Sequence, residues 1–445
     1  MTNGEERAAF ADAGQSRWTK GRIASLVLLL ALLTVGLIST LNRQKGDLIV
    51  YTRAATRALE GTEAYVVEPS SFTHPPAQLI LFTPVALFPR TGERVAWYLI
   101  NVALLAGVAW FLRSIVRAEV AARGTKLRTV WFIVIVLAVC ARYLTAPLEN
   151  QSNDLPILFL MTWCAYARGV GRDVLGGGAA GAATALKATP LLYLPILVWH
   201  RRVGGVMSFV VIAASLSLAP DFLFPREDGM RWVQAWYDTF VGKNEIGAPA
   251  EAEGGWMAWN VLNQSLGGTL YRLSRPETFS REALRDFSLW SPTDGVLRAT
   301  TLAAQAGVLA LVALAVGWPS AGAKDAPDRR MRRLGEVSAV VCGMVLLSPM
   351  SSKAHFCVLL LPTTYMLLHL STRGRDLIVA GCLLATFMLG SLTSKGMIGV
   401  PLGDAVLARG SVTWCALILL IGTVRVAMVR RSADARSSAA AAVMA

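Results

Sequence analysis

Long apolar runs separated by short polar connections fill most of the 445-residue chain. A helix needs about 20 predominantly apolar residues to cross the hydrocarbon core of a membrane. In chain order, the long runs cover approximately 21–41, 95–113, 129–147, 153–169, 174–188, 203–223, 296–318, 334–350, 355–371, 376–394 and 411–429. A shorter run from Pro190 to Trp199 is a candidate for a short or broken crossing. The pattern predicts an all-α fold, a polytopic membrane helical bundle of about twelve spans.

Composition supports this class. The chain is 54% hydrophobic and only 16% charged, whereas soluble domains usually carry about 25% charged residues. Its net charge of +14 does not indicate nucleic-acid binding, because the basic residues sit in short connections and at the chain ends. That placement is typical of the positive-inside pattern of membrane proteins.

The basic connections predict the orientation. Five of them are rich in arginine or lysine, at 113–128, 168–172, 201–202, 320–333 and 373–375, and Arg430 with Arg431 closes the last run. All face one side if the short run crosses the membrane. The positive-inside rule makes that side cytoplasmic, so we expect a multi-pass protein of the cell (plasma) membrane with both termini in the cytoplasm.

The expected organisation is a cytoplasmic tail over 1–20, a transmembrane domain over 21–431 and a disordered tail over 432–445. Two long loops, about 42–94 and 225–295, fall on the outer face. Residues 47–60 have helical spacing, and 230–240 resembles an amphipathic surface helix. The apolar stretch 76–89 is too short to span, which favours a re-entrant or interfacial segment. Residues 247–255 read as a flexible loop, either a lid or a plain connector.

Asp47 is the leading candidate for chemistry. It lies just past the first apolar run, on the predicted outer face. A carboxylate at the bilayer surface is placed to act as a general base on an acceptor hydroxyl. The alternative is a helix cap or an ion pair with Lys45 or Arg53.

Cationic residues at outer-face span ends are the second group. Lys187 lies in an apolar stretch beside Pro190, where it needs an anionic partner. That partner is either a lipid phosphate or an acid of another helix. Lys353 and His355 together are able to bind a phosphate, unless both are interfacial residues that extend to water. His74 precedes two prolines on the same face and is otherwise a loop histidine satisfied by backbone.

Carboxamides form the third group. Asn150, Gln151 and Asn153 belong to a dense polar loop that ends at Asp154. Their amides suit sugar hydroxyls, although an ordinary capped turn is equally compatible. Asn263 gives a weaker version of the same signal.

No phosphate-binding glycine loop for a nucleotide is present in the sequence. A sugar donor would therefore be used at the outer face, where a lipid-phosphate-linked sugar is the natural choice.

Three stretches resemble a known family. They are Asp47–Tyr51 through Phe72–Pro76, then Asn150–Asn153 with Gly171–Asp173 and Ala185–Pro190, and last Leu347–Pro349 with His355. Together they resemble glycosyltransferase family 87, polyprenyl-phosphate-dependent enzymes of the GT-C superfamily, over about residues 45–370. Lys353 and Ala354 depart from the usual residues, and an aromatic more often precedes the two prolines.

The resemblance implies transfer of a mannose-like hexose from a polyprenyl-phosphate donor to a lipid or glycan acceptor, with inversion. Asp47 would be the base, and His355 and Lys187 would hold the donor phosphate. From the residues themselves we also expect Lys353 at the donor phosphate. We expect substrate contacts from Tyr51, His74, Asn150, Gln151, Asn153 and Asn263. Neither a cofactor nor a metal would be needed, because cationic side chains stabilise the leaving phosphate. The alternative is a transporter or flippase for a lipid-linked saccharide, with ionisable residues spread through the bundle midplane.

Overall fold

A computed structural model describes residues 33–43, 46–68, 70–245, 247–250, 255–280, 283–318 and 329–444, with side chains to residue 433. The chain divides into two compact units, Met1–Gln44 and Lys45–Ala445. In the first unit, Leu33–Asn42 is an apolar helix. The predicted cytoplasmic tail over 1–20 lies outside the described residues.

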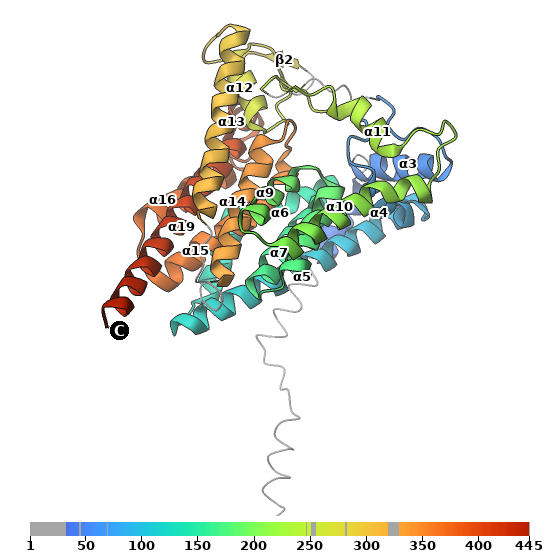
Figure 1. The fold of residues 1–445 in the computed structure, drawn as a ribbon. Helices are drawn as coiled ribbons and strands as arrows, with labels where there is room; N and C mark the ends of the chain where they lie inside the picture. The colour runs from blue at the N-terminus through green and yellow to red at the C-terminus, as the bar shows by residue number, and fades with distance from the viewer. Residues whose placement is uncertain are drawn as a thin grey trace, which may run out of the picture. The chain divides into compact units, whose positions relative to one another are not determined.

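The second unit is mostly helical, and Figure 1 labels most of its elements. The helices of its first half are α3 Leu48–Leu59, α4 Ala77–Ala86, α5 Arg90–Arg123, α6 Thr129–Asn150, α7 Asp154–Gly169, α8 Asp173–Leu186, η1 Thr189–Tyr193, α9 Leu194–Trp199 and α10 Val203–Leu223. Those of its second half are α11 Trp232–Trp236, η2 Tyr237–Val241, α12 Leu266–Ser274, α13 Asp294–Val316, α14 Arg329–Leu347, η3 Lys353–Leu359, α15 Leu360–Arg373, α16 Leu377–Thr386, η4 Phe387–Leu392, α17 Lys395–Ile398, α18 Val400–Ala408 and α19 Ser411–Met444.

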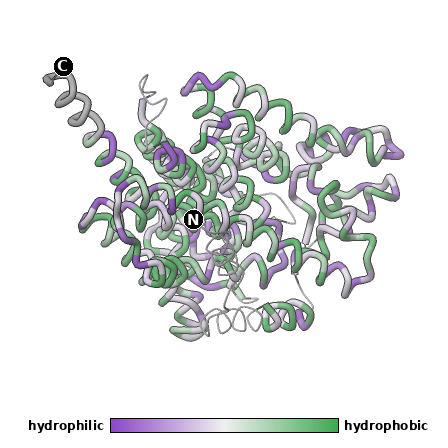
Figure 2. Tube along the Cα trace, turned by 90° about the horizontal axis from the view of Figure 1, so that it is seen from below, coloured by the Kyte–Doolittle hydropathy of each residue, from purple (hydrophilic) through white to green (hydrophobic). Residues whose placement is uncertain are grey.

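The prediction of a helical membrane protein is confirmed, since 75% of the residues are helical. Six helical segments of the described chain are long and apolar enough to cross a membrane: 90–123, 129–150, 203–223, 294–316, 353–373 and 411–433. Runs 153–169, 174–188 and 376–394 form shorter helices, and run 334–350 falls mostly in the 19-residue α14. Most of run 21–41 lies outside the described residues. The structure therefore supports a multi-pass protein without a count of twelve spans. In Figure 2, hydrophobic residues follow the helices and hydrophilic ones lie mostly at bends and helix ends.

Three elements differ from the predicted pattern. The run 95–113 is part of the much longer α5, which begins after Pro89 and ends at Gly124 in a left-handed conformation. In the second outer loop, β1 (Thr278–Ser280) pairs antiparallel with β2 (Ala283–Arg285). The backbone of the predicted C-terminal tail is helical to Met444, in keeping with its many alanines, which are the best helix formers.

The two long loops that the sequence predicts on the outer face share a core of their own. Residues 48–59 are helical, as their spacing predicts, and the stretch predicted as re-entrant or interfacial contains the helix 77–86. Tyr51 and Phe82 of these helices belong to one buried cluster with Trp232 of the second loop. The Trp236 indole donates to the Thr73 carbonyl at 3.0 Å, and Arg226 pairs with Glu63 at 2.6 Å. This small core positions α3, whose first turn follows Asp47.

Helices α8 and α10 pack closely. A Cβ on Gly177 would overlap the Gly205 carbonyl, and one on Gly181 would overlap the Phe209 carbonyl. Small residues allow such contact between membrane helices, which dispersion forces then stabilise. The contact positions the end of α8, where Lys187 follows.

Gly177→Ala should therefore destabilise the protein. The added methyl group has no space, and overpacking typically costs about 1–3 kcal/mol. We expect a lower thermal unfolding midpoint in detergent than for the parent protein.

The matched control is Gly307→Ala on α13, where a Cβ meets no atom within 4 Å. Its midpoint should equal or exceed that of the parent. Equal midpoints for the two variants would mean that the contact between α8 and α10 is not tight.

Candidate active site

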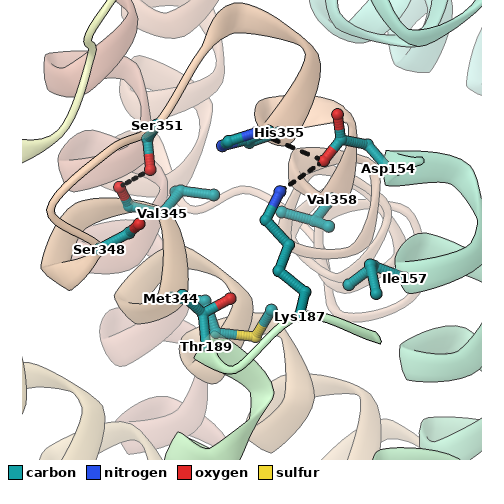
Figure 3. A pocket seen from close by; sticks show the side chains of 10 residues that line it. All are labelled: Asp154, Ile157, Lys187, Thr189, Met344, Val345, Ser348, Ser351, His355 and Val358. Carbon is teal, nitrogen blue, oxygen red and sulfur yellow. Dashed lines mark hydrogen bonds and ion pairs between the residues drawn. The ribbon is translucent and has the colours of Figure 1, made fainter. Parts of the chain in front are cut away.

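One carboxylate joins three segments that are far apart in sequence. The Lys187 Nζ, which follows α8, lies 2.7 Å from Asp154 Oδ1 at the start of α7. The His355 Nε2 of η3 approaches the same oxygen at 3.7 Å. The other carboxylate oxygen accepts a 2.7 Å hydrogen bond from the Ser152 hydroxyl. Figure 3 shows the lysine and the histidine converging on Asp154.

Local sequence explains why these side chains meet. Helix α6 ends at Gln151, whose φ of 55° reverses the chain, and α7 starts three residues later at Asp154. Helix α8 ends at Lys187, which is extended, and Pro190 begins the next helical turn. The Gln78 side chain of α4 donates to the Leu186 carbonyl at 2.7 Å, which satisfies one of the last carbonyls of α8.

The orientation of His355 follows from its neighbour. The Ser352 backbone N–H donates to the imidazole Nδ1 at 3.2 Å. In the neutral tautomer that leaves the proton on Nε2, the nitrogen that faces Asp154. A second contact comes from Trp256, whose ring stacks on the imidazole with centroids 6.4 Å apart. The histidine is therefore held as a hydrogen-bond donor toward the cluster.

These side chains line a small pocket. Its charged and imidazole side chains are Asp154, Lys187 and His355, its hydroxyl side chains are Thr189, Ser348 and Ser351, and Ile157, Met344, Val345 and Val358 complete the wall. Small-molecule sites are typically such concave regions, mostly apolar with a few convergent polar groups. Two cationic or donor groups beside several hydroxyls suit an anionic, oxygen-rich ligand.

Asp47 is not in the pocket lining but lies close to the same polar loop. Its backbone N–H donates to the Asn150 carbonyl at 2.8 Å. Tyr51 lies one helical turn further along α3. Its burial, and then the negative charges of Asp47 and Asp154, raise the pKa of its hydroxyl. The ring of Tyr51 lies 5.3 Å from that of His74. Tyr51 and His74 therefore connect Asp47 to the Asp154 cluster.

His74 is coupled to the pocket by charge. Its partial burial, with the neighbouring Lys187 and His355, lowers its pKa to about 3, and Asp154 opposes the change. The Tyr65 hydroxyl donates to its backbone carbonyl at 3.0 Å. The imidazole is therefore neutral at physiological pH.

The carboxamides have different surroundings. Gln151 and Asn153 are buried at 2% exposure each. The Gln151 side chain lies against Gly46, where a Cβ would come within 3.1 Å of its Oε1. Both polar atoms of the Asn153 side chain are buried without a hydrogen-bond partner in the protein, so Asn153 has unused capacity for a ligand or a water molecule.

Asn263 ties two loops together. Its amide nitrogen donates to the carbonyls of Trp256 and Pro349, and its oxygen accepts from the backbone of Ser265 and Ser351. All four hydrogen-bonding positions of the amide are occupied. Asn263 therefore holds the Trp256 and Pro349 backbones together. In this arrangement the Trp256 ring lies next to His355.

Arg272 also holds this loop in place. It is fully buried and donates to the carbonyls of Ala258, Asn260, Asn263 and Ala408. Burial lowers its pKa to about 9, so the guanidinium stays charged at neutral pH. Lys353, by contrast, precedes the pocket residue His355 in η3 but does not line the pocket.

Asp154 is the site residue that the sequence prediction missed. It ends the polar loop that the prediction singled out, and an acid was the stated alternative partner for Lys187. The sequence alone does not show that Asp154 lies close to Lys187 and His355. The structure shows that Lys187 pairs with an acid of another helix, and that this pair lines the pocket.

The fold defines a multi-pass membrane protein with a polar pocket among its helices. The sequence model of glycosyltransferase family 87 matches residues 72–349, and the chain belongs to this family. It is thus a membrane glycosyltransferase, which sets the transporter alternative aside. Asp47 and His355 lie outside the matched residues. No curated protein compared with the chain matches it.

The lowered pKa of His74 predicts acid-sensitive stability. An unfolded histidine gains its proton near pH 6.5, whereas folded His74 does so only near pH 3. The unfolded state therefore binds more protons between these values, and stability falls as pH falls through them. The thermal unfolding midpoint of His74→Gln should fall less between pH 7 and 4.5 than that of the parent.

Between pH 7.5 and 9 the imidazole is neutral in both states, so the two proteins should respond alike in that range. Identical slopes below pH 6.5 would show that His74 is protonated as readily in the folded protein as in the unfolded chain.

Proposed function

We propose that the protein transfers a mannose-like hexose from a polyprenyl-phosphate donor to a lipid or glycan acceptor at the outer face of the cell membrane. Family membership supports glycosyl transfer. The observation that carries the finer proposal is the convergence of Lys187 and His355 on one pocket. A lysine ammonium and an imidazole N–H are suited to a phosphate monoanion or dianion.

In this proposal the donor phosphate occupies the pocket beside Asp154. Lys187 has three N–H donors, and its pair with Asp154 uses one of them. Asp154 is a positioning residue that holds the ammonium and the imidazole on the same side. Ser348 and Ser351 are hydroxyl-bearing neighbours of the phosphate or the sugar.

Asp47 acts as the general base. The acceptor oxygen forms a bond to the anomeric carbon, and the bond between that carbon and the phosphate oxygen breaks. Its electron pair leaves with the phosphate, and Asp47 takes the hydroxyl proton. Lys187 and His355 stabilise the charge that develops on the departing phosphate, so the step requires no metal. Attack opposite the leaving group inverts the anomeric carbon.

The acceptor approaches between Asp47 and the pocket, near Tyr51, His74 and the loop 150–153. The unpartnered amide of Asn153 is the strongest candidate there for a sugar hydroxyl. The basic connections favour a cytoplasmic position for the opposite end of the bundle. The site therefore faces away from cytoplasmic nucleotide sugars, which favours a lipid-borne donor.

Asp47→Asn should abolish or strongly reduce sugar transfer, because the amide cannot accept the hydroxyl proton. A positioned base contributes roughly 10²–10⁴ in rate. The measurement is transfer from a labelled polyprenyl-phosphate sugar by purified protein.

Glu60→Gln is the matched control, since it removes an exposed acid just after the same helix. It should keep the parent rate. Transfer by Asp47→Asn at that rate would disprove the assignment of the base.

His355→Gln should raise KM for the donor more than KM for the acceptor, because the imidazole is assigned to the donor phosphate. Losing one hydrogen bond to a charged group costs about 1.5–3 kcal/mol, or roughly 10- to 150-fold. Inhibition by free polyprenyl phosphate should weaken by a similar factor.

Lys187→Gln should shift the same two quantities. Lys353→Gln, which changes a residue outside the pocket lining, should have a smaller effect. A larger rise in acceptor KM for His355→Gln would contradict its role on the donor phosphate.

A further inference from the structure

Three connections meet at the end of the bundle opposite the pocket. Arg168, at the end of α7, lies 3.1 Å from Asp173 and 3.2 Å from Glu336 of α14. Arg202, before α10, pairs with the same Asp173 at 3.4 Å. Arg333 of α14 contacts Glu336 at 2.6 Å and the His200 ring at 3.1 Å. The segments 168–173, 200–202 and 329–336 therefore form one cluster, here called the arginine patch.

Positive charge is in large excess in this patch. Its three segments contain eight arginines and only two carboxylates, Asp173 and Glu336. Both carboxylates already pair with arginines. Eight arginines against two carboxylates give the three segments a net positive charge.

Several buried donors of the patch also lack a partner. The Nη2 of Arg168, the Nε of Arg333 and the Nε2 of His200 are buried without a hydrogen-bond partner in the protein. Outside them, Arg172, Arg201 and Arg202 are exposed. Buried excess cations make the site favourable for an external anion, which the exposed guanidiniums reach directly.

Two exposed tryptophans lie beside the arginine patch. The rings of Trp199 and Trp318 are 4.9 Å apart, and the side chains are 46% and 77% exposed. The Trp199 indole donates to the Gly317 carbonyl at 3.0 Å. Arg332 donates to the Trp318 carbonyl at 3.1 Å, so the indole pair is attached to the patch itself.

The surroundings of the patch identify the depth at which it lies. Exposed tryptophans concentrate at the headgroup level of membranes, where their rings meet both apolar and polar groups. Val198 and Val203 are 56% and 70% exposed on either side of the arginine connection. Apolar side chains next to cationic ones fit an acyl chain next to a charged headgroup.

We infer that the arginine patch binds the headgroup of an anionic phospholipid. The phosphate lies against the exposed arginines at 172 and 201–202 and the partly exposed Arg330. The acyl chains lie along Trp199, Trp318 and Val203. A soluble phosphate would use the charges but not the exposed indoles and valines, so we assign the site to a lipid. Clusters of four to eight basic residues next to membrane helices are suited to anionic headgroups.

The test is lipid retention by purified full-length protein in mixed micelles, measured by native mass spectrometry and thermal unfolding. The parent should retain phosphatidylglycerol in preference to phosphatidylcholine and melt at a higher temperature with it. Arg172→Gln with Arg330→Gln should lower phosphatidylglycerol occupancy roughly tenfold or more, given about 1 kcal/mol for each basic residue near an anionic surface.

Arg113→Gln with Arg117→Gln is the control, since it removes two exposed arginines from α5 and should retain lipid as the parent does. Equal retention by the patch variant and this control would overturn the proposal. So would equal binding of phosphatidylcholine, or stabilisation by inorganic phosphate alone that matches the lipid. None of these measurements depends on sugar transfer.

Discussion

The contact between Lys187 and Asp154 is the constraint on which the site depends. A charge so close to apolar helices needs a partner, because an isolated buried ion costs far more than a paired one. The pair joins the end of α8 to the start of α7 at 2.7 Å, and His355 approaches the same oxygen. One buried carboxylate thereby gathers two positively charged or donating groups into a single pocket. Without Asp154, no ion pair would hold the Lys187 ammonium in the pocket.

Packing elsewhere supports this convergence. The close approach at Gly177 holds α8 against α10. Asn263 and Arg272 hold the loop in which Trp256 lies next to His355. The small core around Tyr51 and Trp232 holds α3 near the loop 150–153. Each of these contacts satisfies backbone hydrogen-bonding groups or fills space between the elements around the pocket. Backbone polar groups of loops between membrane helices need such partners.

Hydrophobic patterning was sufficient to predict the class of fold, because runs of about 20 apolar residues have few other structures available to them. It also predicted the helices at 48–59 and 77–86. It did not predict the length of α5 or the β1–β2 pair, which depend on tertiary contacts. For the site, unusual charges indicated Lys187 and His355, but their shared partner Asp154 depends on distances that periodicity does not contain. Asn263 was indicated by its carboxamide, and the structure shows that this amide connects two loops.

The distribution of charge along the helices distinguishes an enzyme from a transporter. Helix α7 carries Asp154 at the pocket and Arg168 at the arginine patch, with no ionisable carboxylate or basic residue between them. The segment from Lys187 to His200 has the same pattern, and so does α14 beyond Glu336. A transporter places its coupling residues near the midplane, where they face each side in turn. Here the carboxylate and basic residues of these three segments lie near their ends, and the pocket residues Asp154, Lys187 and His355 gather at one of those ends. A pocket at one end of the helices suits the glycosyl transfer to which family membership points.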